Sequence, residues 1–444
     1  MRLLFIIPEY PPYSAGGIST FYRHILPELS KQGHQIHVLV GSAFTSKQPS
    51  YELDGVTVEF LDSNVVASNL AKFNRYQAIP EFQRHLAAAW TAWEQVNGGR
   101  GYDLVETTDW GMLFAPWMIS PESPPTVVQL HASIGQIDFH DPQVDSQLQG
   151  NLVRLLELTL LSVADELQTY SHSNAQAWKK LTGRDVNNIP PAMPFISDIQ
   201  ASEKSSHGLV VGRVQYWKGT TILCEALQLL GEKAPIIEWV GRDTTYRDFN
   251  TSMAGYLKQT YPDIWGNKVQ PLGTFSPEET CQLQAKANFI LVPSIWDVFN
   301  YTCVEGMAQG KVVLCSQGAG AADLITNEVN GLTFLAGHAQ SLANSLDTLL
   351  SWSQAKREEV GKVAQETIKT RLNPQFIAQK RLEVYEKLVN HGRYSIAPNS
   401  WLIDAVSPQK PLDKPLGFLD RLPLRELANY LLERSLKKFG KRSL

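Results

Sequence analysis

The sequence predicts an α/β protein made of two doubly wound domains that face each other across a cleft. The chain has 444 residues, more than one ordinary domain needs. Short apolar runs alternate with amphipathic stretches, which is the pattern of parallel strands joined by helices. This alternation stops at a Pro- and Ser-rich stretch around residues 190–207 and then starts again. The break indicates a linker between two halves of similar size.

The first half starts with LLFIIP, a continuous apolar run of the kind found in buried parallel strands. An amphipathic stretch that ends at a glycine follows it and predicts a helix over residues 17–34. Further predicted strands are QIHVLVGS, VTVEFLD, YDLVETTD and TVVQLHAS, and FQRHLAAAWTAWEQV predicts a helix. The stretch LVRLLELTLLSVADELQTYS predicts a helix that runs into a strand. These elements assign residues 1–195 to an N-terminal domain.

The second half repeats the same pattern. Its predicted strands are GLVVGRV, PIIEWVG, KVQPLG and FILVPS, and its predicted helices are GTTILCEALQLLGEK, a stretch near DFNTSMAGYLKQTY, and SPEETCQLQAKA. These elements assign residues 205–370 to a C-terminal domain. A further helix is predicted near residues 372–392, and residues 393–444 form a basic, amphipathic tail.

Composition excludes several classes of protein. Apolar residues make up 43% and charged residues 19%, as in a globular protein, and a net charge of −4 does not indicate nucleic-acid binding. The N-terminal stretch MRLLFIIPEYPP has too few consecutive apolar residues for a signal peptide. No run in the sequence reaches the roughly 20 apolar residues needed to span a bilayer. We therefore expect a cytoplasmic protein, at most peripheral at the inner face of the membrane. Four isolated cysteines fit reduced thiols better than a zinc site or disulfides: Cys224, Cys281, Cys303 and Cys315.

The tail has its own charge. Residues 410–444 contain nine Lys and Arg against four Asp and Glu, a local charge of +5 that leaves −9 on the preceding 409 residues. In RLPLRELANYLLERSLKKFGKR, leucines recur at helical spacing beside these basic residues. An apolar stripe bordered by cations can lie in a membrane interface, and residues 418–442 are a candidate for such contact. The alternative is a helix packed on its own domain or on a second subunit.

A glycine pair follows the first predicted strand, in PEYPPYSAGGIST. Gly16 and Gly17 let the backbone approach a ligand closely, and the next helix presents free N–H groups that suit a phosphate. A plain tight turn is the alternative. The pattern is not GxGxxG, and no acidic residue follows at the expected distance, which argues against a dinucleotide-binding oxidoreductase.

Three further polar residues are expected at the carboxyl ends of strands. Arg213 follows a strand directly in VVGRVQYWKGT, and Lys218 precedes the next helix, so both cations can face the cleft. Together with a helix N-terminus they can hold a diphosphate, or they are two solvated surface charges. His131 ends the predicted strand TVVQLHAS, a position that favours function although a lone histidine is more often structural.

Two acids lie eight positions apart in SIWDVFNYTCVEGMAQG. Asp297 and Glu305 are compatible with a glycosidase pair, a metal site, a hydroxyl-binding site or two solvated charges. A helix is expected to begin near residues 300–302 and to end at Gly310, and its first amides form an anion or hydroxyl site. Glu305 can reach a vicinal diol such as a ribose, and Asp297 the hydroxyls of a neighbouring sugar. A glycine loop with Asp323 follows in SQGAGAADLI.

Taken together, these residues resemble the family 4 glycosyltransferases of the GT-B fold. The matching elements are the glycine loop, the strand-end His131, the GR…KG segment and PS…D-x7-E…A-x-G-x-V, in the right order over about residues 1–390. The resemblance implies two Rossmann-like domains, an acceptor side in 1–195 and a donor side in 205–370. It also implies a retaining enzyme that moves a sugar from UDP-hexose or GDP-mannose to a saccharide or lipid-linked acceptor in polysaccharide biosynthesis.

The resemblance also assigns roles. Arg213 and Lys218 would hold the donor diphosphate, Asp297 would touch the donor sugar, and Glu305 would bind the nucleotide ribose. With His131, the first three form the expected catalytic set. The expected donor-binding set is Gly16, Gly17, Arg213, Lys218, Phe299, Asn300, Tyr301, Thr302 and Glu305. Because the sequence has no Asp-x-Asp, we expect no metal and no cofactor.

Three positions depart from the family pattern. Asp297 stands where the family has Glu, Asn300 where it has Gly, and Gly306 where it has Ala. The acid pair is interpreted as a donor clamp, since a glycosidase has no use for an Arg and Lys pair shaped for diphosphate. With no obvious carboxylate nucleophile, a front-face reaction is favoured. The alternative of the same architecture is a nucleotide-sugar epimerase or hydrolase, which would turn over donor without an acceptor.

Overall fold

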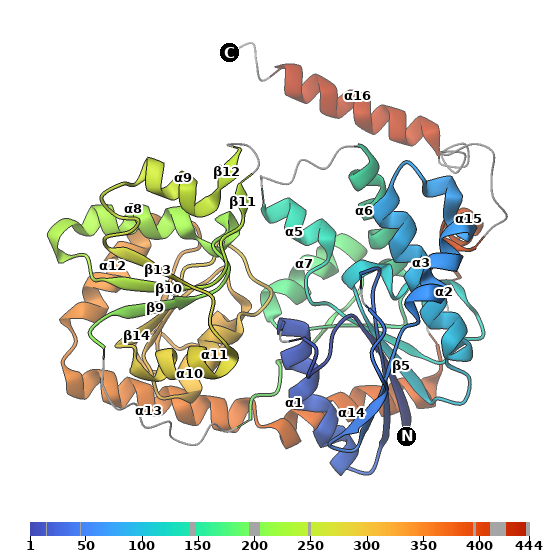
Figure 1. Ribbon diagram of the computed structural model, residues 1–444, viewed down its shortest axis with the longest axis horizontal. Coiled ribbons are helices and arrows are strands. Elements are labelled where there is room, and N and C mark those ends of the chain that lie inside the picture. Colours follow the sequence, from blue (N-terminus) through green and yellow to red (C-terminus); the bar gives the residue numbers. More distant parts are fainter. Residues whose placement is uncertain are drawn as a thin grey trace.

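The computed structural model describes residues 1–14, 16–44, 46–141, 148–194, 205–246, 250–393, 397–408 and 423–440. Two mainly parallel sheets lie side by side, and helices cover both faces of each (Figure 1). The predicted doubly wound α/β class is therefore confirmed. Among the helices of the described ranges, none combines the length and the apolar character needed to cross a membrane.

The first sheet has eight strands in the order β3-β4-β2-β1-β5-β6-β7-β8. All neighbours pair in parallel except β3 and β4, which form an antiparallel edge. The strand order reverses between β1 and β5, so ligands are expected at the carboxyl ends of these strands. The strands are β1 (Arg2–Ile7), β2 (Gln35–Val40), β3 (Tyr51–Leu53), β4 (Val56–Phe60), β5 (Leu104–Thr108), β6 (Thr126–Gln129), β7 (Glu166–Thr169) and β8 (Asn187–Asn188).

Helices join these strands and bury apolar faces against the sheet. The first, α1, carries Phe21, Tyr22, Ile25 and Leu29 at helical spacing, and all four are fully buried. The helices of this half are α1 (Gly17–Lys31), α2 (Ser63–Asn69), α3 (Pro80–Gln95), α4 (Ala115–Ile119), α5 (Ile134–His140), α6 (Leu148–Ser162) and α7 (His172–Thr182).

The second sheet has six parallel strands in the order β13-β10-β9-β14-β15-β16, and its order reverses between β9 and β14. A small hairpin of β11 (Thr245–Tyr246) and β12 (Thr251–Ser252) extends from it. The strands are β9 (Gly208–Val211), β10 (Ile237–Val240), β13 (Val269–Gly273), β14 (Phe289–Val292), β15 (Val313–Ser316) and β16 (Leu332–Phe334). The helices are α8 (Thr220–Leu230), α9 (Met253–Thr260), α10 (Pro277–Lys286), α11 (Tyr301–Ala308), α12 (Ala339–Ser351) and α13 (Gln354–Arg371).

Helix α14 (Pro374–His391) returns from the second sheet and packs on α1 of the first domain (Figure 1). Its Arg381 is fully buried and forms an ion pair with Glu106 of β5, with 2.5 Å between Nη2 and Oε2. Arg381 also donates to Gln129 on β6, and Tyr22 on α1 donates to the other oxygen of Glu106 at 3.0 Å. The core of the first domain is therefore completed by a helix from the end of the chain.

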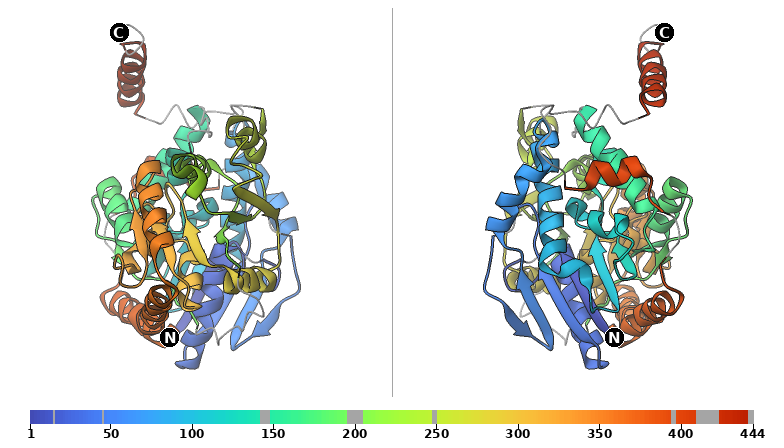
Figure 2. Two further views of the ribbon diagram at one scale, coloured as in Figure 1. Left: turned by 90° about the vertical axis from the view of Figure 1, so that its left-hand side faces the viewer. Right: turned by 90° about the vertical axis from the view of Figure 1, so that its right-hand side faces the viewer.

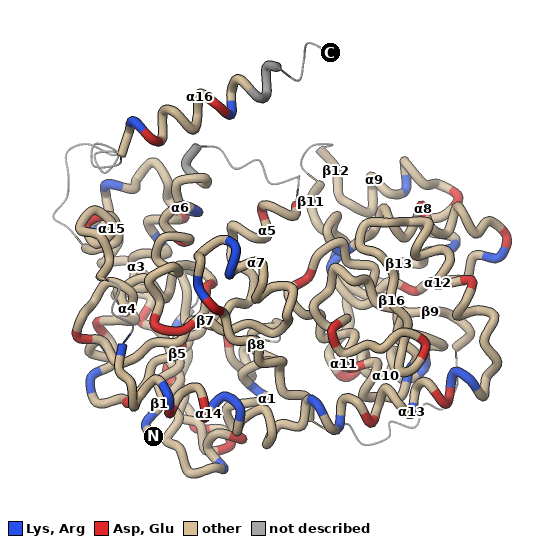
Figure 3. The backbone as a smooth tube through the Cα atoms, turned by 180° about the vertical axis from the view of Figure 1, so that it is seen from behind, with Lys and Arg blue, Asp and Glu red and all other residues tan. Residues whose placement is uncertain are grey.

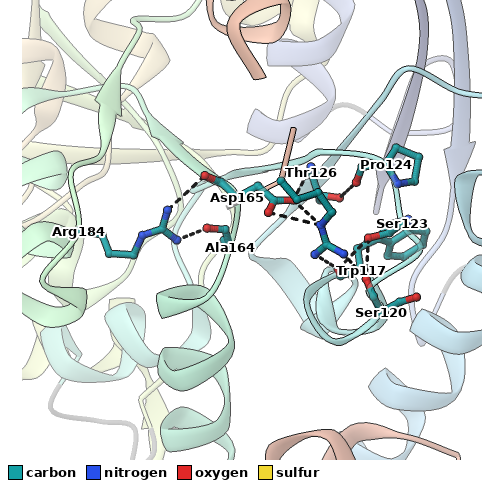
Figure 4. Close-up of polar contacts among 9 residues, drawn as sticks. Trp117, Ser120, Ser123, Pro124, Thr126, Ala164, Asp165 and Arg184 are labelled. Atoms are coloured by element: carbon teal, nitrogen blue, oxygen red, sulfur yellow. Dashed lines mark hydrogen bonds and ion pairs between the residues drawn. The ribbon is translucent and has the colours of Figure 1, made fainter. Parts of the chain in front are cut away.

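The chain after α14 stays attached to the first domain. Arg393 donates to the carboxylate of Asp165 at 3.1 Å and to the carbonyl of Trp117, a region drawn in Figure 4. Helix α15 (Ser400–Val406) then buries Leu402 and Val406 in a second apolar cluster of the first domain, separate from the one that α14 enters. The predicted tail therefore has a packed first part. Its second part, α16 (Leu424–Gly440), projects from the body in Figures 1 and 2, and Leu427 near its start packs against the first domain.

Candidate active site

The candidate site lies where the strand order of the second sheet reverses. Strand β9 leads into Arg213 and Lys218, and the neighbouring strand β14 leads into Asp297 and α11. Parallel strands end at the same edge of a sheet, so residues almost 80 positions apart in the chain meet there. This is the expected place for a ligand in a doubly wound fold.

Gly219 brings the two strand ends together. It follows a short 3-10 turn, η4 (Tyr216–Lys218), and has a φ of 79°. A Cβ at this position would overlap the carbonyl group of Pro293, just after β14. Only glycine tolerates both the left-handed backbone and this close approach. As a result, Lys218 lies beside the loop that carries Asp297.

Lys218 and Asp297 form an ion pair with 2.5 Å between Nζ and Oδ2. The two side chains are only 17% and 14% exposed. Asn300 also donates to Oδ2, at 3.0 Å, and the backbone of Asp297 pairs with Gly318 and Gly320 on either side. Asp297 is therefore held rigidly, with its charge directed at the expected diphosphate-binding lysine.

Asn300 has a left-handed backbone, a conformation that favours glycine. Its φ is 86°, and its side chain caps α11 by accepting from the backbone N–H of Cys303 at 3.2 Å. Asparagine adopts positive φ more readily than most residues, and it is a preferred N-cap. The change at Gly306 also has a physical reason, because a Cβ there would lie 2.7 Å from Ile290 of β14. Close packing of α11 on the sheet requires the glycine.

Glu305 lies on α11 and faces α10. Gln284 of α10 donates to its Oε2 at 2.8 Å. Burial raises the pKa of Glu305, and the hydrogen bond from Gln284 opposes this shift. The buried hydroxyl of Tyr301 has no hydrogen-bond partner among the described residues, and Thr302 donates to the carbonyl of Val211 at 3.2 Å. Glu305 does not contact Asp297, because Glu305 pairs with Gln284 and Asp297 pairs with Lys218. The two acids therefore do not form a carboxylate pair.

Arg213 differs from Lys218 in having no partner that holds it. It is exposed, and within the described ranges it makes no hydrogen bond and no ion pair. The charges that act on it are the positive Arg242 and the negative Asp297. A small cavity beside Lys218 runs along the strand ends, lined in part by Gly212, Trp239, Ser294 and Asn300.

His131 follows β6 in the first domain, as the sequence predicts. The hydroxyl of Tyr170 hydrogen-bonds to its Nδ1, and the ring of Phe21 lies 5.4 Å away. Burial lowers the pKa of His131 well below its usual value, so the imidazole is neutral. Asp109, after β5, accepts from the backbone N–H of His131 at 2.9 Å and of Ala132 at 3.3 Å. Asp109 thus fixes the loop that positions the histidine, a role that the sequence did not reveal.

The predicted glycine loop contains a carboxylate. Glu9, two residues after β1, accepts from the backbone N–H of Ser19 at 2.9 Å in the first turn of α1. A Cβ at Gly16 would overlap the same carboxylate. Gly17 opens the helix, where a Cβ would meet nothing within 4 Å. Any anion at this helix N-terminus would therefore meet the carboxylate of Glu9. Glu9 was not among the site residues predicted from the sequence, although its position just after β1 was a signal that it lies at this edge of the sheet.

Contacts between the domains connect His131 to the loop of Asp297. Tyr170, which holds His131, has its ring 5.9 Å from that of Phe299. Ser171 donates to the carbonyl of Val298 at 3.0 Å. Asp323, expected in a glycine loop near the site, instead accepts from the first N–H of α7 at 2.7 Å. On α5, the ring of His140 stacks on Trp296, next to Asp297, with 4.4 Å between ring centroids.

Within the described residues, no group of three or more His, Cys, Asp or Glu side chains is placed to hold a metal ion.

Comparison with known proteins assigns the class. The chain is a glycosyltransferase with the GT-B fold, and it is a hexosyltransferase. Residues 16–184 match the family model described as Glycosyl transferase 4-like domain, and residues 195–367 match the model described as Glycosyl transferases group 1. Both models describe glycosyltransferase domains, and together they span most of the chain.

Several known proteins are similar to this chain over most of its length. An uncharacterised glycosyltransferase of Methanocaldococcus jannaschii is 22% identical over 404 residues, 87% of this chain and 98% of the relative. The structure of sucrose-phosphate synthase from Thermosynechococcus elongatus has a TM-score of 0.67 at 18% identity, over 88% of this chain and 100% of that one. The structure of the Anabaena protein HepE in complex with UDP-glucose has a TM-score of 0.61 at 20% identity, over 87% of this chain and 100% of that one. At these identities the structures show the shared fold.

Proposed function

We propose that the chain is a retaining family 4 glycosyltransferase that moves a hexose from UDP-hexose or GDP-mannose to a hydroxyl of a saccharide or lipid-linked acceptor. Its place would be polysaccharide biosynthesis at the inner face of the membrane. The observation that carries the proposal is the group of Arg213, Lys218 and Asp297 at the reversal point of the second sheet. At this edge of the sheet, the two cations could bind a negatively charged diphosphate, and the fixed carboxylate could bind the hydroxyls of the attached sugar.

The donor would bind along this edge. Arg213 makes no ion pair within the described part of the chain, so its guanidinium is available for a diphosphate. Lys218 would add a second cation and Asp297 would accept hydroxyls of the sugar. The N-terminal amides of α11, which follow Asn300, would complete the anion site. Glu305, further along α11, would accept both hydroxyls of the ribose.

The reaction proposed is a front-face displacement. The bond between the anomeric carbon and the diphosphate oxygen breaks first, and Arg213 and Lys218 stabilise the negative charge that develops on the leaving group. The acceptor hydroxyl then bonds to the anomeric carbon on the same face and gives its proton to the departing phosphate. His131, neutral and held by Tyr170, would line the sugar site from the other domain without adding charge. No metal or cofactor takes part in this scheme.

A thermal-shift screen with UDP-, GDP- and ADP-sugars tests the donor. Ligand at 100 times its Kd adds about 2.7 kcal/mol to the free energy of unfolding, so one sugar nucleotide should raise Tm measurably. The Lys218→Ala variant should lose this shift, and Lys258→Ala on α9 is the matched control that should keep it. Absence of a shift with every nucleotide in the wild-type protein would contradict the proposed donor class.

Turnover assays separate transfer from the alternatives. With donor alone, the proposed transferase should release nucleoside diphosphate slowly, and a saccharide or lipid-linked acceptor should accelerate release. Rapid release or epimerisation without an acceptor would instead establish the epimerase or hydrolase. Activity should persist in excess EDTA, and loss that added divalent metal restores would refute the metal-independent mechanism.

A further inference from the structure

Helix α16 exposes an apolar face that nothing in the described chain covers. It carries several strongly exposed leucines on one short element, at 54% for Leu424, 65% for Leu432 and 64% for Leu436, whereas α7 and α8 carry one each. Leu431 is 41% exposed. Isolated exposed leucines are common, but a contiguous group on one element marks an interaction surface.

These residues share one side of the helix. Successive helical residues are about 100° apart, so Leu424, Leu431, Leu432 and Leu436 fall within about 140° of the circumference, a sector that also contains Arg425. Leu427 lies at the edge of this face, is partly buried, and contacts the core of the first domain. Glu426 and Glu433 occupy the opposite side. The helix is therefore amphipathic, attached to the body at one edge and open over its apolar face.

Charge favours an anionic surface as the occupant. The segment 410–444 carries +5, while the preceding 409 residues carry −9. Two copies of the chain that met through α16 would bring two basic segments together, and like charges at close range oppose such an interface. A single helix of 17 residues also offers less area than the roughly 800 Å² per partner of a stable protein interface. An anionic lipid surface satisfies both the apolar face and the charge.

The position of α16 agrees with this occupant. Helices α13 and α14, which join the two domains, run along one side of the molecule, and α16 stands on the opposite side (Figures 1 and 3). Helix α5 and the β11–β12 hairpin lie on the same side as α16 (Figure 1). The site loop is close to α5, because His140 of α5 stacks on Trp296. A surface that receives α16 would therefore lie on the same side of the molecule as α5, which contacts the site loop.

We propose that α16 docks in the interface of an anionic bilayer, with Leu424, Leu431, Leu432 and Leu436 among the acyl chains. The basic segment around it is attracted to the headgroups. Docking does not depend on the sugar chemistry. Its consequence, that the acceptor is lipid-linked and enters from the bilayer, rests on the proposed function.

Vesicle co-sedimentation of the full chain tests the docking. Wild-type protein should sediment with vesicles that contain phosphatidylglycerol at low salt, and less with phosphatidylcholine alone or at 1 M salt, where the Debye length falls to about 3 Å. The double variant Leu432→Ser/Leu436→Ser should lower the partition coefficient at least about tenfold, because two apolar side chains no longer enter the interface. The matched control is Leu181→Ser/Leu229→Ser, two leucines that are 53% and 56% exposed on α7 and α8. It should bind as the wild type does.

Each outcome has one meaning. Wild-type protein that stays in the supernatant with anionic vesicles at low salt overturns the docking, as does an α16 variant that binds as the wild type does. Loss of a dimer in light scattering for the α16 variant, without any vesicle binding by the wild type, would assign α16 to a second copy instead. The thermal-shift screen with UDP-, GDP- and ADP-sugars is run in parallel. If no sugar nucleotide raises Tm while vesicle binding holds, the proposed function fails and the docking stands.

Discussion

Replacement of Asp297 by Asn should strengthen the binding of a nucleoside diphosphate and at the same time stop sugar transfer. The carboxylate of Asp297 holds Lys218 at 2.5 Å. A bound diphosphate has to share this ammonium with the carboxylate. Asn keeps the shape of the side chain and the hydrogen bond with Asn300, but it releases the lysine charge for the phosphates.

The size of the effect follows from the burial of the pair. Exposed ion pairs contribute about 0.2–1 kcal/mol, and this pair, with side chains 17% and 14% exposed, belongs at the upper end. About 1 kcal/mol corresponds to roughly a fivefold lower Kd for the nucleoside diphosphate. This is a lower bound, because the substitution also removes a negative charge beside the phosphates. Turnover should fall by about 10² or more, since the sugar loses a group fixed for the transition state.

Calorimetric titration with UDP and GDP measures the Kd of the nucleoside diphosphate, and a turnover assay with the sugar donor measures the loss of transfer. The variant Asp347→Asn is the control, because Asp347 forms a surface ion pair with Lys233 on the same domain at 3.7 Å. It should change neither quantity. In the Lys218→Ala background, Asp297→Asn should still improve affinity, through the loss of repulsion alone and by a smaller factor.

An affinity that falls on Asp297→Asn would refute this reasoning. It would mean that the carboxylate supports the diphosphate site, for instance by holding Lys218 in its binding position. Unchanged transfer activity would show that Asp297 does not contact the donor sugar.

Three further predictions concern binding and stability. If Glu305 holds the ribose, Glu305→Gln should weaken the binding of the nucleoside diphosphate and of the complete donor by the same factor in calorimetry. Weaker binding of the donor alone would assign Glu305 to the sugar. Burial raises the pKa of Asp109 from 3.8 to about 7 and that of Glu157 from 4.5 to about 8. The folded state then keeps protons that the unfolded state releases, so the free energy of unfolding should fall as pH rises from about 4 to about 8. Asp109→Asn should flatten this slope in urea unfolding at several pH values, and an unchanged slope would contradict the assignment. Arg381→Met should cost about 3–5 kcal/mol in the same assay, because Glu106 stays buried without its cation, and Glu106→Gln in that background should recover part of the loss.

The sequence was sufficient for the features that repeat locally. Apolar runs such as residues 2–7 and 289–292 identified buried strands, and the order of strands and helices identified the doubly wound class. The strand-end positions of Arg213, Lys218 and Asp297 were predictable for the same reason, because parallel strands end at one edge. What these side chains contact there was not predictable.

Side-chain contacts that depend on the folded path of the chain could not be predicted from the sequence. No local pattern indicates that Glu9 accepts from Ser19, because this contact depends on the path of the chain between β1 and α1. Nor does one indicate that Asp109 holds the backbone of His131, which depends on how two strand-end loops pack. Asp323 appeared to belong to a flexible loop, but the close packing of Gly320 on Ser171 makes it part of the contact between domains.

Helix α14 also determines when the first domain can finish folding in the cell. Arg381 leaves the ribosome 275 residues after Glu106, its ion-pair partner in β5. At about 5–20 residues per second, the delay is roughly 15 to 55 s. During this time the nascent first sheet holds a buried carboxylate without its cation, and the surface that α14 will cover is open. The second domain, synthesised in between, can complete its own sheet earlier. The half of the protein that is made first is therefore the half that matures last, and a nascent chain stalled before residue 374 should expose the first domain to chaperones and proteases.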